Sequence, residues 1–285
     1  MKRKTIMVSA VLALLVLLIG NSLYSSKYNL EVSEYTINSD LINQPVRIVQ
    51  LSDLHNSVFG TENSKLIFLV SSQNPDIILI TGDLVNSNDP NYEIALNLVT
   101  ELTSFAPVYI SWGNHEVAYE NNYGIDLKSL FEEAGADVMD YEYSDISVNG
   151  QELRLGGIYG YCLPDKYLLT NEADERECEF LTDFQTTDLY TILMCHMPVC
   201  WILNNGLDEW DVDCVISGHV HGGQIIIPFA GGVYAPDFGK FPGRLEGIYY
   251  SKDSSKNMVL SRGLGTVESI PRFNNIPEVV VVNYK

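Results

Sequence analysis

The sequence predicts an α/β fold, a four-layer α-β-β-α sandwich in which helices flank two mixed sheets, preceded by an N-terminal transmembrane anchor. An uncharged apolar run behind a basic N-terminus indicates the anchor. Strand, helix, strand, helix and strand follow one another over residues 45–116, the order of a doubly wound unit. A second group of apolar strands after residue 146 indicates a second sheet in the same domain.

Residues 1–27 form the predicted anchor. The uncharged stretch Thr5–Tyr24 follows the basic start MKRK and, as a helix, is about 30 Å long, enough to cross a bilayer. Basic residues before the span place the N-terminus in the cytoplasm, so we expect a single-pass cell-membrane protein whose globular domain is extracytoplasmic. The alternative is secretion after signal cleavage, for which Gly20-Asn-Ser22 is a weak site. A buried core helix is disfavoured because the run is apolar on every face.

The elements of the first half follow from hydrophobic periodicity. Residues 28–44 are a polar connector with a short strand at Leu30–Ile37, and the globular domain covers residues 45–285. The predicted strands are PVRIVQLSDLH (45–55), PDIILITGDLV (75–85) and PVYISWGNHE (107–116). Between them we expect helices in residues 61–74, with Thr61 as a possible N-cap, and in Tyr92–Phe105. The near-continuous apolar run of 75–85 is typical of a buried parallel strand.

The second half is richer in strands. Residues 146–158 read as a hairpin with Asn149-Gly150 as its turn. LYTILMCHMP (189–198) and DVDCVISGHVHGG (211–223) are predicted strands that end in histidines. Short strands follow in IYYS, NMVLS and EVVVVNY, between Gly247 and Tyr284.

The charge of the chain limits its partners. The formal net charge is −20, and residues 28–220 contain 32 acidic but only 6 basic residues. Such a domain repels a polyphosphate backbone, which disfavours nucleic acid as a partner. If the protein acts on phosphates it needs local positive charge, which bound metal ions supply.

Cysteine usage gives a weaker signal. The five cysteines contain no Cys-x-x-Cys, and an odd count outside the cytoplasm leaves at least one free thiol or an intermolecular bridge. Cys195 and Cys214 lie in apolar runs and read as small buried residues. A bridge between Cys162 and Cys178 is one further possibility.

Five of the apolar strands end in a short polar signature, and all five histidines of the chain lie in these signatures. The signatures are Asp53-x-His55, Gly82-Asp83, Gly113-Asn114-His115-Glu116, His196, and Gly218-His219-Val220-His221. Each one alone has a simpler explanation, such as a helix cap, a turn or a buried core histidine. Because ligands bind beyond the carboxyl ends of strands in open α/β sheets, we expect the five to converge on one rim.

The side chains of the rim are those of a metal site. Mixed nitrogen and oxygen ligands suit Mn, Fe, Zn or Co, and the absence of thiolate argues against structural zinc. The candidate ligands are Asp53, His55, Asp83, Asn114, His196, His219 and His221. Seven are too many for one ion but suit two ions that share a carboxylate. Such a pair lowers the pKa of a bridging water and clamps phosphoryl oxygens during in-line attack.

The order of these motifs resembles the calcineurin-like metallophosphoesterases. The resemblance covers Val46 to the C-terminus and rests on all five signatures in order at plausible spacing. The extended motif GHVHGGQIIIP and the tail SRGLGTVESIPRFNNIPEVVVV are similar to a bacterial membrane-associated branch, which includes phosphodiesterases and a lipid-precursor pyrophosphatase.

The resemblance implies a role for each motif. Asp53, His55 and His221 would bind the first metal, and Asp83 would bridge both ions. The second metal would have the ligands Asn114, His196 and His219. Among the catalytic residues, His115 would be the general acid or electrostatic partner for the leaving oxygen, with Glu116 orienting its imidazole.

We therefore expect a membrane-anchored phosphohydrolase with two divalent or transition metal ions, Mn favoured, that attacks a phosphodiester or pyrophosphate bond by a metal-bridging hydroxide. The expected substrate is a phosphorylated small molecule or a lipid-linked one, and Arg262 and Arg272 of the tail are candidate substrate-binding residues. The alternatives are a phosphomonoesterase or nuclease of the same fold, or a non-catalytic binding scaffold. The scaffold is disfavoured because no ligand position is replaced.

Overall fold

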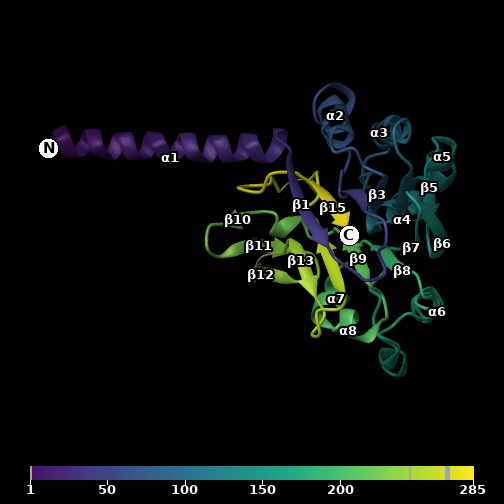
Figure 1. The fold of residues 1–285 in the computed structure, drawn as a ribbon. Coiled ribbons are helices and arrows are strands. Elements are labelled where there is room, and N and C mark those ends of the chain that lie inside the picture. The colour runs from purple at the N-terminus through teal and green to yellow at the C-terminus, as the bar shows by residue number, and fades with distance from the viewer. Residues whose placement is uncertain (1, 244, 267–269) are drawn as a thin grey trace.

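A computed structural model describes residues 2–243, 245–266 and 270–285, with side chains from Thr5 onward. Residues 267–269, part of the tail that carries the resemblance, lie outside the described residues. The chain forms a body of sheets and helices from which one long helix, α1 (Lys2–Tyr28), extends to the N-terminus (Figure 1). The stretch Thr5–Tyr28 of this helix is long and apolar enough to cross a membrane.

Two six-stranded mixed sheets form the centre of the body. The first has the order β1-β15-β2-β3-β4-β5 and the second β13-β14-β9-β8-β7-β6. The strands of the first sheet are β1 (Glu31–Ile37), β2 (Val46–Leu51), β3 (Ile77–Thr81), β4 (Val108–Ser111), β5 (Asp137–Met139) and β15 (Glu278–Tyr284). Those of the second are β6 (Glu142–Val148), β7 (Gln151–Ile158), β8 (Tyr190–Cys195), β9 (Cys214–Ser217), β13 (Gly247–Tyr250) and β14 (Asn257–Leu260). Strands β2 to β5 pair in parallel, as do β7, β8, β9 and β14.

Helices cover the outer face of each sheet. On the first sheet these are η1 (Thr61–Asn63), α2 (Ser64–Ser72), α3 (Glu93–Thr103), α4 (Asn114–Tyr123) and α5 (Leu127–Glu133). On the second they are η2 (Asp165–Thr170), α6 (Glu175–Phe184), α7 (Val199–Leu203) and α8 (Gly206–Glu209). The predicted four-layer sandwich is thereby confirmed.

The alternation of side chains along each strand explains the four layers. In β3, Ile78 and Ile80 pack against the helices, whereas Ile77 and Leu79 face the other sheet. In β15 the valines divide in the same way between the two cores. Strands with both faces buried have no polar face, which is why their sequences read as continuous apolar runs.

The structure adds elements that periodicity did not reveal. Helix α5 and strand β5 were not expected, and neither was a separate three-stranded antiparallel sheet of β10 (Ile226–Ile227), β11 (Gly231–Ala235) and β12 (Gly239–Gly243). A short 3-10 turn, η3 (His221–Gly223), leads into this small sheet. The expected N-cap at Thr61 was wrong: α2 begins at Ser64, because Glu62 and Asn63 adopt left-handed conformations with φ of 49° and 61°.

Two local predictions can be compared with the structure. The turn Asn149-Gly150 joins β6 to β7 with φ of 54° and 83°, as the hairpin prediction required. The Cys162–Cys178 bridge is absent, and all five cysteines are buried free thiols. The Sγ atom of Cys162 lies 3.5 Å from that of Cys195 instead, in the core under the second sheet.

Candidate metal centre

The five polar signatures converge where five strands end. They follow β2, β3 and β4 of the first sheet and β8 and β9 of the second, all at the carboxyl ends. Parallel register aligns these ends, since Leu51 pairs with Ile80 and Met194 with Ile216. The side chain of Gln50 ties the two sheets together at this rim by donating to the Ser217 carbonyl at 2.8 Å. The seven candidate ligands therefore meet from both halves of the sandwich.

The backbone of the rim is strained. Five of the seven candidate ligands have positive φ: Asp53 (54°), His55 (45°), Asp83 (56°), His219 (73°) and His221 (48°). For residues with a Cβ this conformation costs roughly 1–2 kcal/mol each. Strain of this kind persists only where the surrounding structure enforces it, and it is typical of functional sites.

Two glycines allow the loops to approach one another. A Cβ on Gly113 would lie 2.2 Å from Oδ1 of Asp83, and a Cβ on Gly218 would lie 2.5 Å from Oδ2 of Asp53. Neither glycine has a positive φ, so close packing against a carboxylate, and not backbone conformation, is what requires glycine here.

One group of potential ligands consists of Asp53, His55 and His221, whose ligand atoms lie within 4.8 Å of one another. Nε2 of His221 is 3.6 Å from Oδ1 of Asp53. The backbone N–H of His219 donates to both carboxylate oxygens of Asp53, at 3.0 and 3.1 Å, and holds that carboxylate in place. All three side chains are buried.

A second group consists of Asp83, His196 and His219. Nδ1 of His196 lies 2.6 Å from the Thr81 carbonyl, so it carries the hydrogen and leaves the Nε2 lone pair free. Nε2 of His219 lies 3.1 Å from the Asp237 carboxylate, which leaves its Nδ1 lone pair free. These two free nitrogens are only 3.2 Å apart. Two lone pairs cannot bond each other, so the arrangement calls for a cation or a proton between them.

Unsatisfied buried atoms give an independent test of whether metal ions fit. Both ring nitrogens of His55 and Oδ1 of Asn114 are buried and accept or donate no hydrogen bond within the part of the chain that the structure describes. Leaving such atoms without a partner costs about 1–3 kcal/mol each. Both residues belong to the predicted ligand set, and the nitrogen and oxygen donors suit the predicted metals. The residues therefore fit two metal ions.

The pKa values of the buried histidines differ because their electrostatic surroundings differ. Burial lowers the pKa of His55 to about 3 and holds that of His221 well below its usual value, so both are neutral at pH 7 with a lone pair to offer. Burial opposes protonation of His196 too, but the Asp83 carboxylate, 3.2 Å from its Nε2, raises the pKa to about 10. In the metal-free protein a proton thus occupies a position that a metal ion would take.

His115 lies at the edge of the same cluster. Its backbone N–H donates to Oδ1 of Asp83 at 2.9 Å, and its ring packs edge-on against His55 with centroids 4.5 Å apart. The backbone N–H of Ser87 donates to Nδ1 of His115 at 3.1 Å. Nδ1 is then the acceptor, so Nε2 carries the ring hydrogen and can donate a hydrogen bond to a leaving oxygen.

Glu116 does not orient His115, contrary to the expectation from the resemblance. As the third residue of α4 its side chain turns back over the helix N-terminus, away from the imidazole. Its carboxylate accepts N–H bonds from Asp83, Leu84, Val85 and Gly113, at 2.7 to 3.1 Å. It thereby fixes the loop that presents Asp83, while the Ser87 N–H holds His115.

The two arginines of the tail have protein partners. Arg262 forms ion pairs with Glu31, with Glu246 at 2.9 Å and with Glu278 at 3.4 Å. Arg272 is 2% exposed and donates to the carbonyls of Gly265 and Arg262, while its Nη2 lies 3.3 Å from Nδ1 of His221. Substrate binding by either residue stays a prediction, and the contacts of Arg272 also suit positioning of the His221 loop.

Sequence patterns missed three residues that hold the centre together. Asp237 binds His219, the Ser87 N–H binds His115, and the Asn275 carboxamide donates to the carbonyls of His221 and Gln224 at 2.7 and 3.1 Å. None belongs to a strand-end signature. The only signal in the sequence is that Asp237 and Asn275 are polar residues between apolar segments, which describes many loop residues.

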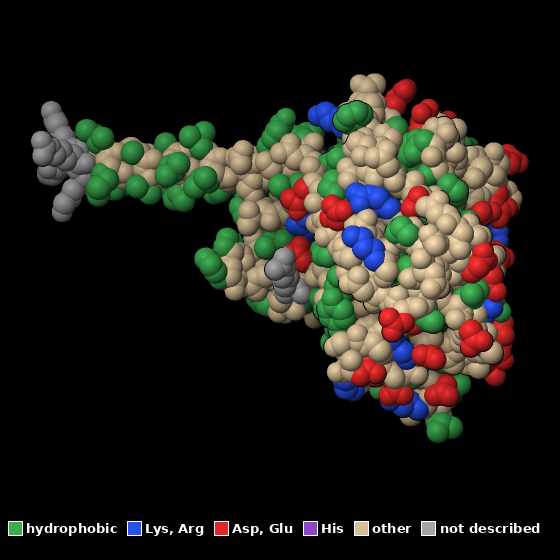
Figure 2. Space-filling model, viewed as in Figure 1, with side chains coloured by type: hydrophobic (Ala, Val, Ile, Leu, Met, Phe, Trp, Pro, Cys, Tyr) green, Lys and Arg blue, Asp and Glu red, His purple; other side chains and the backbone are tan. Residues whose placement is uncertain are grey.

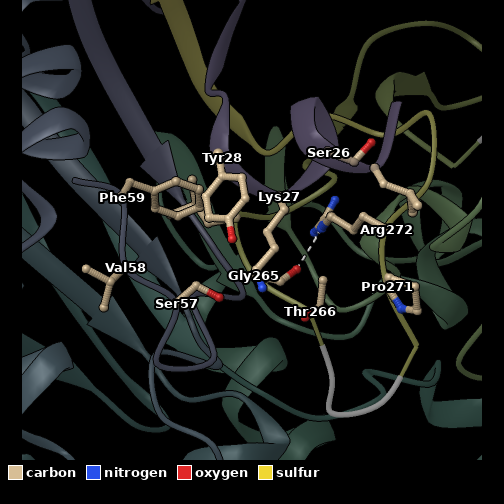
Figure 3. A pocket seen from close by; sticks show the side chains of 12 residues that line it. Ser26, Lys27, Tyr28, Ser57, Val58, Phe59, Gly265, Thr266, Pro271 and Arg272 are labelled. Atoms are coloured by element: carbon tan, nitrogen blue, oxygen red, sulfur yellow. Dashed lines mark hydrogen bonds between the residues drawn. The ribbon is translucent and has the colours of Figure 1, made fainter. Parts of the chain in front are cut away.

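A cavity of about 570 Å³ lies between the end of α1 and residues 57–59, 264–266 and 271–272 (Figure 3). Leu23, Tyr28, Val58 and Phe59 form apolar walls, and Lys27 adds a positive charge. Arg272 connects the cavity to the centre, because it lines the cavity and its Nη2 also contacts Nδ1 of His221.

Comparison with known proteins agrees with this geometry. The model of the family "calcineurin-like phosphoesterase" matches residues 46–223, more than half of the chain and a region that contains every candidate ligand. The chain is 30% identical over 275 residues to the metallophosphoesterase YkuE of Bacillus subtilis (strain 168), covering 93% of this chain and 89% of that protein. It is 27% identical over 250 residues to the phosphodiesterase YaeI of Escherichia coli (strain K12), covering 84% and 82%.

Among solved structures, the phosphopantetheinyl hydrolase PptH of Mycobacterium tuberculosis aligns with a TM-score of 0.46 and 15% identity over 75% of this chain and 87% of that one. The family match and the relatives agree with the order of motifs along the chain. Since the matched region carries the whole rim, the chain belongs to the calcineurin-like phosphoesterase family and is a hydrolase of phosphoric esters.

Proposed function

We propose that the protein is a membrane-anchored phosphoesterase that uses two metal ions to hydrolyse a phosphodiester or pyrophosphate bond. Asp53, His55 and His221 would hold one ion, and Asn114, His196 and His219 the other, with Asp83 between them. The observation that carries this proposal is the pair of facing lone pairs on His196 and His219, together with the unsatisfied atoms of His55 and Asn114.

The bound ions supply positive charge that activates a water molecule and neutralises the phosphoryl oxygens. The residues of the chain would orient the metal ligands and contact the leaving group. Asp237 and the Thr81 carbonyl fix the tautomers of His219 and His196. His115 presents an Nε2 hydrogen, which would donate a hydrogen bond to the oxygen of the leaving group and stabilise the negative charge that develops there as the bond to phosphorus breaks. Manganese is the metal we favour, since carboxylate, amide and imidazole donors together suit it.

The cavity at the end of α1 supports a substrate with a lipid part. Its apolar walls belong in part to the apolar helix itself, through Leu23, and its charged residue Lys27 suits an anionic headgroup. We therefore propose a phosphorylated substrate that is small or lipid-linked, with the acidic surface disfavouring nucleic acid. Residues 1–27 would be a single-pass anchor, residues 28–44 a connector and residues 45–285 the catalytic domain on the extracytoplasmic side.

The test is an activity panel on the full chain in non-ionic detergent with Mn²⁺. Nitrophenyl phosphodiester, phosphomonoester and pyrophosphate substrates are compared, each with and without an acyl tail. We expect hydrolysis that a chelator abolishes and that Mn²⁺ restores, with a preference for the diester or pyrophosphate and for the tailed form. Full activity after chelation would rule out the two-metal mechanism, and equal rates with and without a tail would rule out the lipid-linked substrate.

A further inference from the structure

We propose that the small sheet β10-β11-β12 makes a second contact with the membrane, by inserting the tip of the β10–β11 hairpin into the bilayer interface beside α1. The inference rests on the proposed role of α1 as an anchor.

The hairpin exposes apolar side chains that a soluble surface would bury. Phe229 at its tip is 110% exposed, Phe241 on β12 is 64% exposed, and Ile227 and Tyr234 are 42% and 50% exposed. The segment Ile225–Ala235, IIIPFAGGVYA, contains no charged residue, although the chain as a whole is 19% charged. Contiguous exposed apolar side chains mark an interaction surface, and aromatic with aliphatic residues are typical of the bilayer interface.

Hydrogen bonds place the base of the hairpin beside the apolar part of α1. The backbone N–H of Asn274 donates to Ser22 Oγ of α1 at 2.8 Å, and the Asn274 side chain donates to the Ile226 carbonyl of β10 at 3.3 Å. Ser22 lies inside the uncharged stretch Thr5–Tyr24. If that stretch crosses the bilayer, the base of β10 is already at the level where the helix enters the lipid.

The hairpin also points in the direction of the bilayer. Figure 1 shows β10 and β11 projecting from the body on the side from which α1 leaves, and Figure 2 shows hydrophobic side chains both along α1 and at the end of that projection. Ile270, which is 51% exposed, lies beside the start of the hairpin, because its carbonyl accepts a hydrogen bond from the side chain of Gln224. The exposed apolar side chains of the hairpin thus lie on the same side of the body as α1, which favours lipid over a second copy of the chain.

Depth-dependent quenching of tryptophan fluorescence tests the contact in the full chain. The native tryptophans Trp112, Trp201 and Trp210 are 3%, 2% and 5% exposed and give a constant background. Phe229→Trp places a probe at the hairpin tip. Leu169→Trp is the matched control, because Leu169 is 92% exposed on η2, which packs on α6, and Figure 1 shows α6 on the side of the body away from α1. Both variants are incorporated into phosphatidylcholine vesicles whose acyl chains carry bromine near the headgroup.

We expect the emission of Phe229→Trp to shift to the blue and to lose intensity in brominated vesicles, while Leu169→Trp keeps a solvent-like spectrum. A chain that floats with the vesicles but shows no quenching of Phe229→Trp overturns this inference and leaves the anchor and the phosphoesterase proposal intact. A blue shift without quenching also overturns it, since it indicates a protein partner or a second copy. A chain that does not float overturns the anchor, and the inference falls with it.

Discussion

The metal rim and the β10–β11 hairpin depart from the usual distribution of side chains in opposite directions. The rim buries three carboxylates and five imidazoles to 8% exposure or less, whereas the hairpin exposes a phenylalanine completely. Most other apolar side chains of the body fill its three cores, with isolated exceptions such as Phe68 and Leu169. Each departure is costly unless something outside the chain compensates it. The two proposals give both departures the same explanation, a partner outside the chain: metal ions for the rim and lipid for the hairpin.

The largest effect is expected from removing the carboxylate of Asp83, which we propose to bind both metal ions. Asp83→Asn keeps the shape but removes the charge that lies 3.2 Å from His196 and 3.5 Å from His55. We expect phosphodiesterase activity to fall by on the order of 10³-fold, together with the metal content measured by elemental analysis. Asp145→Asn, which only loses a surface ion pair with Arg154, is the control. Retained metal and activity in Asp83→Asn would contradict the two-metal site.

Replacing His115 separates stabilisation of the leaving group from metal binding. We expect His115→Ala to lower kcat by about 10²-fold or more, while the metal content stays that of the parent. Because His115 would stabilise the negative charge on the leaving oxygen, the loss should be smaller for a nitrophenol leaving group than for an aliphatic alcohol. Equal losses for both leaving groups, or loss of metal, would make His115 a ligand instead, since it also lies within 4.8 Å of a ligand atom of His55 and Asp83.

Adding a methyl group at Gly113 tests how tightly the rim is packed. In Gly113→Ala the new Cβ meets Oδ1 of Asp83 at 2.2 Å, so the carboxylate must move. A displacement of about 1 Å at the reacting centre costs about 10²-fold in rate, and we expect a loss of this size in kcat/KM. In the control Gly124→Ala the backbone φ is 65° but the new Cβ has open space. That variant should lose stability without losing specific activity per folded molecule.

Replacing Asp237 tests a residue that orients the candidate ligand His219 but is not itself a ligand. Asp237→Asn weakens the bond that orients His219, and we expect an apparent metal affinity about tenfold lower, measured as activity against free Mn²⁺ concentration. At saturating Mn²⁺ the activity should return to near the parent value. Tyr161→Phe removes only the 3.3 Å bond from Tyr161 to Asp237 and should change the affinity less. An affinity unchanged in Asp237→Asn would show that His219 needs no such support.

The smallest effect is expected at the hairpin. Phe229→Ser should change the free energy of unfolding in detergent solution by no more than about 0.5 kcal/mol, because this side chain is fully exposed. Phe131→Ala, at a position that is 0% exposed, should cost about 3–5 kcal/mol in the same denaturant titration. A large destabilisation by Phe229→Ser would mean that the hairpin serves the fold and not a partner.

Much of the fold and the ligand set could be predicted from the sequence because both are encoded locally. Strands such as 75–85 have both faces buried, and the polar residues that follow them mark the rim. The resemblance added the pairing of ligands, and the closeness in space of the ligand atoms of Asp53, His55 and His221 agrees with that pairing.

The rest of the site depends on contacts that no local pattern encodes. Glu116 turns away from His115 because consecutive helical side chains point in directions about 100° apart, and its carboxylate meets backbone N–H groups of a different loop. Asp237 reaches His219 across 18 residues of chain, and Asn275 reaches the His221 carbonyl across 54. The small sheet was missed because a glycine-rich apolar segment without period 2 or 3.6 has no secondary-structure signal.

The joint between α1 and the body has a mechanical consequence. The backbone N–H groups of Asn274 and Asn275 donate to Ser22 and Ser26 of the helix, and Ser26 is 1% exposed. Asn275 in turn donates to the His221 carbonyl, so a series of hydrogen bonds joins the helix to the loop that carries the candidate ligand His221. A spanning helix adjusts its tilt to the thickness of the bilayer. If α1 spans the membrane, a change in its tilt would also tilt the catalytic domain. The thickness of the bilayer would then affect how the active site is oriented toward the lipid surface.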